Sequence, residues 1–178
     1  MKQALRTQIR EKRKAISPDL YAKKSAAIRE KLEKMPEFQA AKNLLVYVST
    51  NEEVDTHAII KDCLASGKKI YAPKVEGEHI FICRITDWEQ LKPGSFGILE
   101  PCEILDPAHP EIMDLILVPG IAFDKRGHRI GYGKGFYDSM LKAGNGLKVG
   151  LAFSEQMVDE IPDESHDVSL DLVITDTP

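Results

Sequence analysis

Hydrophobic positions in the first part of the chain recur with the period of a helix. Residues 18–35 carry an apolar stripe at alternating spacings of four and three, which is typical of a helix with one buried face. Ser17 and Pro18 precede this stripe as an N-cap and a first helical residue, and Pro36 ends it. Residues 2–16 also have helical propensity. The pattern therefore predicts two consecutive helices before the first strand.

Further along the chain, the apolar residues form short continuous runs, which are typical of buried strands. These runs cover residues 43–49, 69–73, 79–84, 114–118, 148–153 and 171–175. We expect helices at residues 56–66 and 136–143, and we expect the proline-rich residues 87–110 to form a long loop over one edge or end of the sheet. Strands that alternate with helices favour an α/β fold with an open, mostly parallel sheet and helices on both faces. We therefore predict a single three-layer domain that spans residues 1–178.

Length and composition narrow the class of protein. A chain of 178 residues is long enough for one well-buried core and short for two domains. Its 43% hydrophobic and 29% charged residues are typical of a soluble globular protein. The net charge of -4 argues against a general nucleic-acid binder, so we expect no nucleic-acid partner. Neither a secretory signal nor an apolar stretch of membrane-spanning length is present, so we expect a cytoplasmic protein without a membrane partner, and we expect it to be a monomer.

The cysteines and histidines do not have the spacing of metal sites. Cys63, Cys83 and Cys102 are widely spaced, odd in number and without a C-x-x-C pair, so neither a disulfide framework nor a zinc site is indicated. The five histidines show no H-x-x-x-H or H-E-x-x-H pattern. We therefore expect reduced thiols and no histidine-bound metal.

The most informative segment runs from Gly127 to Asp138, where four glycines lie within twelve residues together with Arg129 and Lys134. Glycine lets backbone N–H groups turn towards an anion through conformations that other residues avoid, and successive N–H groups then form a concave nest for phosphate oxygens. Lys134 adds a point charge to this nest. The segment follows the strand at 114–118, beyond the carboxyl end where open α/β sheets bind their ligands. It therefore predicts a phosphate-binding loop.

Two familiar phosphate loops are excluded by spacing. A P-loop needs glycine where this chain has His128, and Ser or Thr where it has Gly135. A dinucleotide-binding loop follows its strand directly, whereas these glycines lie about a dozen residues beyond theirs. A glycine-rich surface hairpin remains as an alternative. Such a hairpin does not account for Tyr137 and Asp138 close in sequence to the two cations of the segment. An ATP-and-magnesium site needs cations for the phosphates and a carboxylate for the metal.

Two other segments are candidates for the same crevice. The N-terminal helix has a basic stripe made of Lys2, Arg6, Arg10, Arg13 and Lys14. A run of charged residues on a helix most often forms a face exposed to solvent. We interpret Arg10, Arg13 and Lys14 in this way. Lys2 and Arg6 would instead bind a ligand if the amino end of this helix lies beside the phosphates.

The second candidate segment is the polar cluster at residues 49–56, which follows the carboxyl end of the first strand. Helix capping explains Asp55 and Thr56 in this cluster. It leaves Glu52 and Glu53 without an explanation.

Taken together, these residues resemble the 5-formyltetrahydrofolate cyclo-ligase family, also called methenyltetrahydrofolate synthetases. The likeness rests on residues 117–138 and extends, in the family's order, to Lys2 and Arg6, residues 53–56, residues 96–101 and residues 171–175. It implies a single α/β domain and a ligase of one-carbon metabolism. Such an enzyme uses ATP and magnesium to convert 5-formyltetrahydrofolate to 5,10-methenyltetrahydrofolate, through a phosphorylated formyl group (an imidate phosphate), and releases ADP and phosphate.

The resemblance also implies a role for each matching position. The ATP-binding residues are Lys2, Arg6, Arg129, Ile130, Gly131, Tyr132, Gly133, Lys134, Gly135, Phe136 and Tyr137. Among them, Arg129 and Lys134 are the catalytic candidates, with Lys134 near the transferring phosphoryl group. The folate contacts are Glu53 on the pterin ring, Phe96 in its pocket, and Tyr137, and the magnesium ligands are Asp138 and Asp171.

Two departures from the family leave ligand contacts open, because Tyr132 stands where some relatives have arginine and Phe136 where many have tyrosine. Two other functions also remain open. One is an ATP-dependent ligase or kinase that shares the loop but acts on another small molecule. The other is a folate- or nucleotide-binding protein without catalysis, against which the presence of both Lys134 and Asp138 argues.

Overall fold

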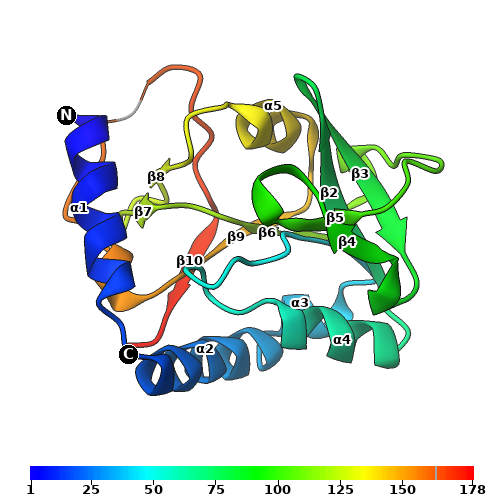
Figure 1. Ribbon diagram of the computed structural model, residues 1–178, viewed down its shortest axis with the longest axis horizontal. Helices are drawn as coiled ribbons and strands as arrows, with labels where there is room; N and C mark the ends of the chain where they lie inside the picture. The colour runs from blue at the N-terminus through cyan, green and yellow to red at the C-terminus, as the bar shows by residue number, and fades with distance from the viewer. Residues whose placement is uncertain (163) are drawn as a thin grey trace.

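A six-stranded sheet forms the centre of the protein in the computed structural model, which describes residues 1–162 and 164–178 (Figure 1). The strands are β1 (Asn43–Val46), β2 (Lys69–Glu76), β3 (His79–Ile85), β6 (Leu115–Val118), β9 (Leu147–Ala152) and β10 (Leu172–Thr175). Their order is β10-β9-β6-β1-β2-β3, and neighbouring strands are parallel except β2 and β3, which form an antiparallel hairpin. The predicted open, mostly parallel sheet is confirmed.

The order of the strands changes direction between β1 and β6. From β1 the chain moves outward to β2 and β3, and it then returns to the other side of β1 to add β6, β9 and β10. The loops that leave the carboxyl ends of β1 and β6 therefore run in opposite directions and leave a crevice between them. Open α/β sheets bind their ligands at such a point.

Helices cover both faces of the sheet. They are α1 (Lys2–Lys14), α2 (Pro18–Glu33), α3 (Pro36–Ala40), α4 (His57–Ala65) and α5 (Phe136–Ala143). In Figure 1, α2, α3 and α4 lie along one face, α5 lies on the other, and α1 stands beside the short strands β7 (Ala122–Phe123) and β8 (Arg129–Ile130). Side chains alternate along β1, so Leu44 and Val46 pack with α2 and α4 while Leu45 packs with α5.

Local signals place several helix ends as predicted. The Ser17 hydroxyl accepts a hydrogen bond from the Leu20 N–H at 3.3 Å, and Pro18 begins α2. The helix predicted at 136–143 is α5, and it ends at Gly144. Each of these positions depends on residues within one or two turns, which explains why the sequence pattern was sufficient.

Residues 87–110 differ from the prediction of a long loop. They contain β4 (Leu91–Pro93) and β5 (Leu99–Pro101), which pair as a small antiparallel sheet. The Lys74 ammonium of β2 donates to the Glu100 carboxylate at 3.0 Å, which ties this small sheet to the central one. This segment also contains the short 3-10 helices η1 (Trp88–Gln90) and η2 (Ser95–Gly97), whereas η3 (Pro110–Ile112) begins at its end and η4 (Ser154–Gln156) lies after β9. Strands of three residues are too short to show an alternating pattern, so the turn residues dominated the prediction.

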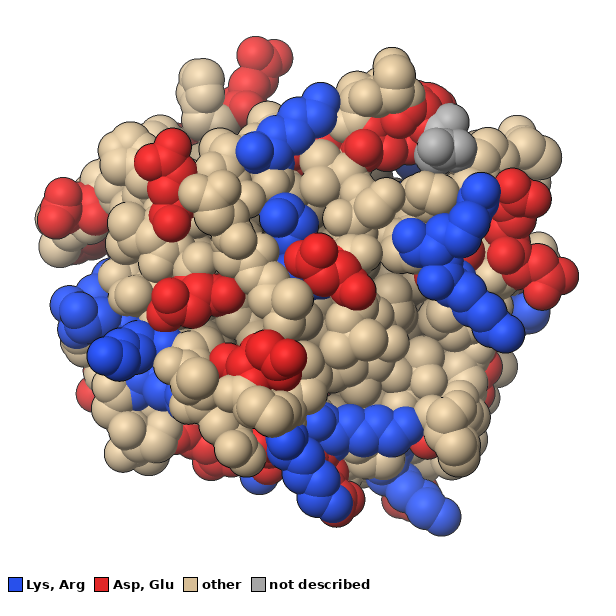
Figure 2. Space-filling model, turned by 180° about the vertical axis from the view of Figure 1, so that it is seen from behind, with Lys and Arg blue, Asp and Glu red and all other residues tan. Residues whose placement is uncertain are grey.

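The surface of the protein carries mixed charge. Acidic and basic side chains are interspersed over the back face (Figure 2). Among the described residues, no helix combines the length and the apolar character that a membrane crossing requires.

Candidate active site

A large cavity lies in the crevice at the carboxyl ends of β1 and β6. Its volume is about 1130 Å³, which is above the range of about 300–1,000 Å³ that is typical of a site for one small molecule. Its lining comes from the start of α1, the loop after β1, the β4–β5 sheet, the segment from β8 to α5, and residues 164–167. Segments far apart in the sequence therefore meet around one space.

A buried carboxylate fixes the base of the glycine-rich segment. Asp124 follows β7 and is fully buried, and its two oxygens accept hydrogen bonds from the N–H groups of Arg126, His128 and Ile161 at 2.9–3.0 Å. Burial acts to raise the pKa of Asp124, but these backbone donors outweigh burial and hold the pKa below its usual value. The turn that leads into the glycine-rich segment is therefore rigidly held.

Glycine leaves room for the Arg129 guanidinium in this segment and permits the left-handed backbone at the start of α5. A Cβ atom at Gly131 would lie only 2.8 Å from the Arg129 Nη1 atom. Gly135 has a φ of 68° and stands at the N-cap of α5, where no described side chain caps the first N–H groups. The Arg6 Nε atom donates to the Gly131 carbonyl at 3.0 Å, which ties α1 to the loop. A helix N-terminus with open N–H groups favours an anion.

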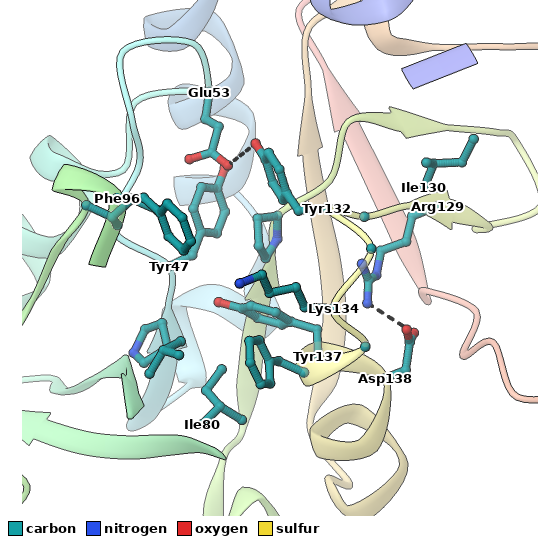
Figure 3. Close-up of a pocket in the computed structure, with 18 of the residues that line it drawn as sticks. Tyr47, Glu53, Ile80, Phe96, Arg129, Ile130, Tyr132, Lys134, Tyr137 and Asp138 are labelled. Carbon is teal, nitrogen blue, oxygen red and sulfur yellow. Dashed lines mark hydrogen bonds and ion pairs between the residues drawn. The ribbon is translucent and has the colours of Figure 1, made fainter. Parts of the chain in front are cut away.

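Arg129 is a nearly enclosed cation with an unused donor. Its side chain is 6% exposed, and its Nη2 atom donates to the Asp138 Oδ1 atom at 3.1 Å (Figure 3). The Nε atom is buried and has no hydrogen-bond partner among the described residues. Burial lowers the pKa of Arg129, against the opposing charge of Asp138. A buried guanidinium with a free donor is well suited to an anionic ligand.

Lys134 reaches across the cavity to the opposite wall. Its ammonium nitrogen lies 4.7 Å from the centroid of the Phe96 ring. Phe96 itself is 84% exposed and has a φ of 59°, which is unusual for a bulky side chain. The strained backbone of η2 thus presents an aromatic ring at the mouth of the cavity, in contact with the glycine loop.

Glu53 lies across the cavity from Arg129, with both carboxylate oxygens held in place. The residue is 7% exposed. Its Oε2 atom accepts from the Thr50 N–H at 2.9 Å, and its Oε1 atom accepts from the Tyr132 hydroxyl at 2.6 Å (Figure 3). Tyr47 lies beside it in the cavity wall, and burial, followed by the charge of Glu53, raises the pKa of this phenol. The geometry leaves one lone pair on each oxygen for a ligand.

The loop that carries Glu53 is held by the residues predicted to cap the next helix. The Asp55 carboxylate accepts from the His57 N–H at 2.8 Å, at the start of α4. The Thr56 hydroxyl instead points back, and it donates to the Tyr47 carbonyl at 2.6 Å and accepts from the Ser49 N–H at 3.0 Å. These contacts turn the chain sharply at the end of β1 and place Glu53 on the cavity wall.

The basic stripe of α1 is not a solvated face along its length. Arg13 is buried, with its side chain 1% exposed, and its Nη2 atom lies 3.4 Å from the Glu52 Oε2 atom. Arg10 lines the cavity and lies 5.6 Å from the centroid of the Tyr132 ring. The solvated-face prediction is therefore wrong for Arg13, whereas Arg10 and Lys14 are exposed as predicted, although Arg10 also borders the cavity. The reason is tertiary, because α1 packs against β7, β8 and the loop after β1.

Asp171 lies away from the site predicted for it. It precedes β10 at the amino end of the sheet, opposite to the cavity, and its Oδ2 atom accepts from the Lys148 N–H at 2.8 Å. Its carboxylate thus fixes the start of the β9–β10 pair and does not share an ion with Asp138. The carboxylates of Glu164 and Asp167 do line the cavity, where they form ion pairs with Lys2 at 3.0 Å and 3.1 Å.

With the exception of Asp171, the structure brings the predicted site residues to one cavity. The residues concerned are Lys2, Arg6, Glu53, Phe96, Arg129, Ile130, Gly131, Tyr132, Gly133, Lys134, Gly135, Phe136, Tyr137 and Asp138. Sequence reasoning missed Tyr47, because an aromatic residue at the end of a buried strand resembles core. It also missed Glu164 and Asp167, although the run of ligand-type residues at 164–167 was a usable signal.

Comparison with known proteins gives a consistent result. The model of the 5-formyltetrahydrofolate cyclo-ligase family matches residues 1–176. The chain is 32% identical to a 5-formyltetrahydrofolate cyclo-ligase of Mus musculus, over 97% of this chain and 92% of that protein. It is 31% identical to a mitochondrial 5-formyltetrahydrofolate cyclo-ligase of Arabidopsis thaliana, over 98% of this chain and 73% of that protein. The NMR structure of Aquifex aeolicus 5,10-methenyltetrahydrofolate synthetase superimposes with a TM-score of 0.89 and 37% identity, covering 99% of this chain and 90% of that chain.

Proposed function

Since the chain belongs to the 5-formyltetrahydrofolate cyclo-ligase family and is an enzyme of folate one-carbon metabolism, we propose that it converts 5-formyltetrahydrofolate and ATP to 5,10-methenyltetrahydrofolate, ADP and phosphate. We further propose that residues 1–178 act as one catalytic domain. One observation carries the proposal: a single cavity has cations and open backbone N–H groups on one side and an anchored carboxylate, Glu53, on the other. Such a cavity suits an anionic and a heterocyclic ligand held side by side.

The nucleotide belongs on the side of α1 and the glycine loop in this proposal. The phosphates would accept hydrogen bonds from Lys2, Arg6, Arg129 and Lys134, and the free Nε donor of Arg129 supports this assignment. Ile130 is buried, so it would contribute its backbone rather than its side chain. The glycines and the first turn of α5 would likewise offer N–H groups.

The folate belongs on the side of Glu53. Each carboxylate oxygen of Glu53 already accepts one hydrogen bond and has a lone pair left, which suits the paired N–H donors of a pterin edge. The aromatic rings of Tyr47, Phe96 and Tyr137 line the same cavity and offer apolar walls for the ring system. The formyl group would then face the phosphates across the cavity.

The chemistry requires activation of a poor electrophile. In the proposed reaction, the formyl oxygen of the substrate attacks the γ-phosphorus of ATP, the bond to ADP breaks, and an imidate phosphate forms. The folate N10 then attacks the formyl carbon and loses its proton, the carbon–oxygen bond breaks, phosphate leaves with that proton as hydrogen phosphate, and the methenyl cation remains. Lys134 and Arg129 would neutralise the phosphoryl charge as it shifts.

A magnesium ion fits this site through its carboxylates. Magnesium prefers oxygen ligands and is commonly held by one or two carboxylates together with substrate phosphates. Asp138 and Asp167 both line the cavity, and each is paired with a cation that ATP would also contact, Arg129 and Lys2 respectively. We propose these two carboxylates as its protein ligands. When bound, magnesium supplies neutralisation of the phosphate charge.

The proposed function is tested by incubating the pure protein with 5-formyltetrahydrofolate, ATP and magnesium. We expect the near-ultraviolet absorbance of the methenyl product to rise, with ADP formed in equal amount, and we expect no rise when ATP or magnesium is left out. ADP formation without the methenyl product would indicate another ATP-dependent reaction. Folate binding without turnover would indicate a non-catalytic protein, and either result refutes the proposal.

A further inference from the structure

Tyr132 connects the two sides of the cavity. It belongs to the glycine loop, yet its hydroxyl donates to Glu53, which is 79 positions away in the sequence, at 2.6 Å. Figure 3 shows the phenol turned across the cavity with its oxygen against the carboxylate. The Thr50 N–H donates to the other oxygen at 2.9 Å, so both oxygens of the Glu53 carboxylate are hydrogen-bonded. The Tyr132 side chain therefore meets the carboxylate side of the cavity.

Two arginines of α1 flank Tyr132. The Arg10 guanidinium lies 5.6 Å from the centroid of the Tyr132 ring. Arg13 is buried, and its Nε and Nη1 atoms have no acceptor among the described residues. Although Tyr132 as a whole is 45% exposed, burial of its hydroxyl end and the charge of Glu53 raise its pKa, while Arg13 acts to lower it. The hydroxyl thus lies within reach of both a buried anion and a buried cation.

We propose that Tyr132 is a positioning residue of the folate pocket, whose hydroxyl keeps the Glu53 carboxylate facing the cavity and away from Arg13. This inference rests on the proposed function and assigns the Tyr132 side chain to the folate rather than to ATP. It makes Tyr132 a determinant of selectivity for ring systems that present adjacent N–H donors. A ligand of that chemistry needs both oxygens of Glu53 in a fixed orientation.

The physical reason is competition for the carboxylate. Without the hydroxyl, Glu53 would keep only the Thr50 N–H. Arg13 acts on the same hydroxyl and has two donors without an acceptor among the described residues, so it would compete for the freed carboxylate oxygen. The carboxylate would then turn from the cavity, and a ligand would have to reverse that pairing to bind.

A second role for Tyr132 is less consistent with the contacts. The phenol would be a placeholder if the folate had to displace it from Glu53. Each carboxylate oxygen accepts more than one hydrogen bond, however, and the Tyr132 hydroxyl uses only one lone pair of one oxygen. Displacement is therefore not required. The two roles predict opposite effects of removing the hydroxyl. Folate affinity should rise if the hydroxyl competes with the folate for Glu53, and it should fall if the hydroxyl holds Glu53 in place.

The test is Tyr132→Phe, which removes one oxygen atom from this contact. Calorimetric titrations should give a dissociation constant for 5-formyltetrahydrofolate about tenfold above that of the wild type, with the constant for ATP unchanged within about twofold. The KM for the folate should rise more than kcat falls. Tyr71→Phe is the matched control, because Tyr71 of β2 is buried in the core that also contains Leu45 and does not line the cavity. It should leave both constants unchanged.

A double variant separates positioning from a general structural effect. If Tyr132 acts through Glu53, Tyr132→Phe combined with Glu53→Gln should bind the folate no more weakly than Glu53→Gln alone. Additive losses would overturn the inference, as would tighter or unchanged folate binding in Tyr132→Phe, or a loss of ATP affinity. If the wild type binds the folate and forms the methenyl product, such results refute the inference alone. If the wild type binds no folate, the proposed function fails and the inference fails with it.

Discussion

Replacement of Glu53 by glutamine tests the placement of the two ligands in the cavity. The substitution keeps the size of the side chain and exchanges one acceptor oxygen for an NH₂ donor. Both protein contacts of Glu53 can survive this exchange. The remaining carbonyl oxygen can accept from the Thr50 N–H, and the Tyr132 hydroxyl can turn to accept from the new NH₂ group. We therefore expect Glu53→Gln to fold normally.

The loss should fall on the ligand instead. The lone pair that faced a pterin N–H is replaced by a second donor, so one buried N–H of the folate has no acceptor. A hydrogen bond to a charged group contributes about 1.5–3 kcal/mol, and 1.4 kcal/mol corresponds to a factor of ten in affinity. The dissociation constant for 5-formyltetrahydrofolate should therefore rise about 10- to 100-fold. ATP affinity should stay unchanged, because the buried Arg129 that would meet its phosphates lies across the cavity from Glu53 (Figure 3).

Separate calorimetric titrations with 5-formyltetrahydrofolate and with ATP measure both effects. Glu78→Gln is a suitable control, because it makes the same chemical change in the exposed turn between β2 and β3. Thermal unfolding of both variants should match the wild type. If ATP affinity falls while folate affinity holds, Glu53 belongs to the nucleotide site and the proposed placement of the two ligands is reversed.

Three further substitutions address the phosphates, the metal and the loop base. Lys134→Ala should lower kcat about a hundredfold while folate affinity holds, because a cation beside the phosphoryl group acts mainly in the transition state; wild-type turnover in this variant, or an equal loss in Lys61→Ala outside the cavity, would contradict that role. Asp138→Asn should need more magnesium for half-maximal activity, whereas Asp171→Asn should follow the wild type, and identical magnesium curves for all three proteins would show that Asp138 is not a ligand. Asp124→Asn should lower the free energy of unfolding by about 1–3 kcal/mol at pH 7, because one buried acceptor oxygen is lost. Since the folded state holds the pKa of Asp124 below its usual value, despite burial, this stabilisation is present above about pH 4 and is lost as the pH falls through the lower folded-state pKa. Urea unfolding of wild type and Asp124→Asn at pH 7 and at pH 3 checks the sign, and a difference that grows at pH 3 would contradict it.

The sequence by itself determined the elements whose signals are local. The Ser17–Pro18 start of α2 and the end of α5 at Gly144 depend on hydrogen bonds and backbone conformations within a turn or two of the residue concerned. The strands of the central sheet were visible because each contains a short apolar run, and the inner strands β1, β6 and β9 are buried over most of their length. The glycine-rich segment at 127–138 likewise indicated an anion site from residue types alone.

Tertiary structure decided how side chains on separate elements pair. Arg13 resembles a solvated helical cation in the sequence, but the packing of α1 buries it beside Glu52. Asp171 has the residue type of a metal ligand but lies at the wrong end of the sheet, whereas Asp167 lines the cavity. The chain alone also gave no reason to join Tyr132 to the carboxylate of the loop after β1.

The physical reason for this division is the range of the interactions. Helix caps, glycine conformations and apolar periods act over a few residues and can be read along the chain. Whether a carboxylate faces an arginine, a phenol or a cavity depends on which loops the sheet order brings together. In this protein, the strand order changes direction between β1 and β6, and this change opens the crevice. The loops after these two strands meet α1 and residues 164–167 there, which determines how their side chains pair.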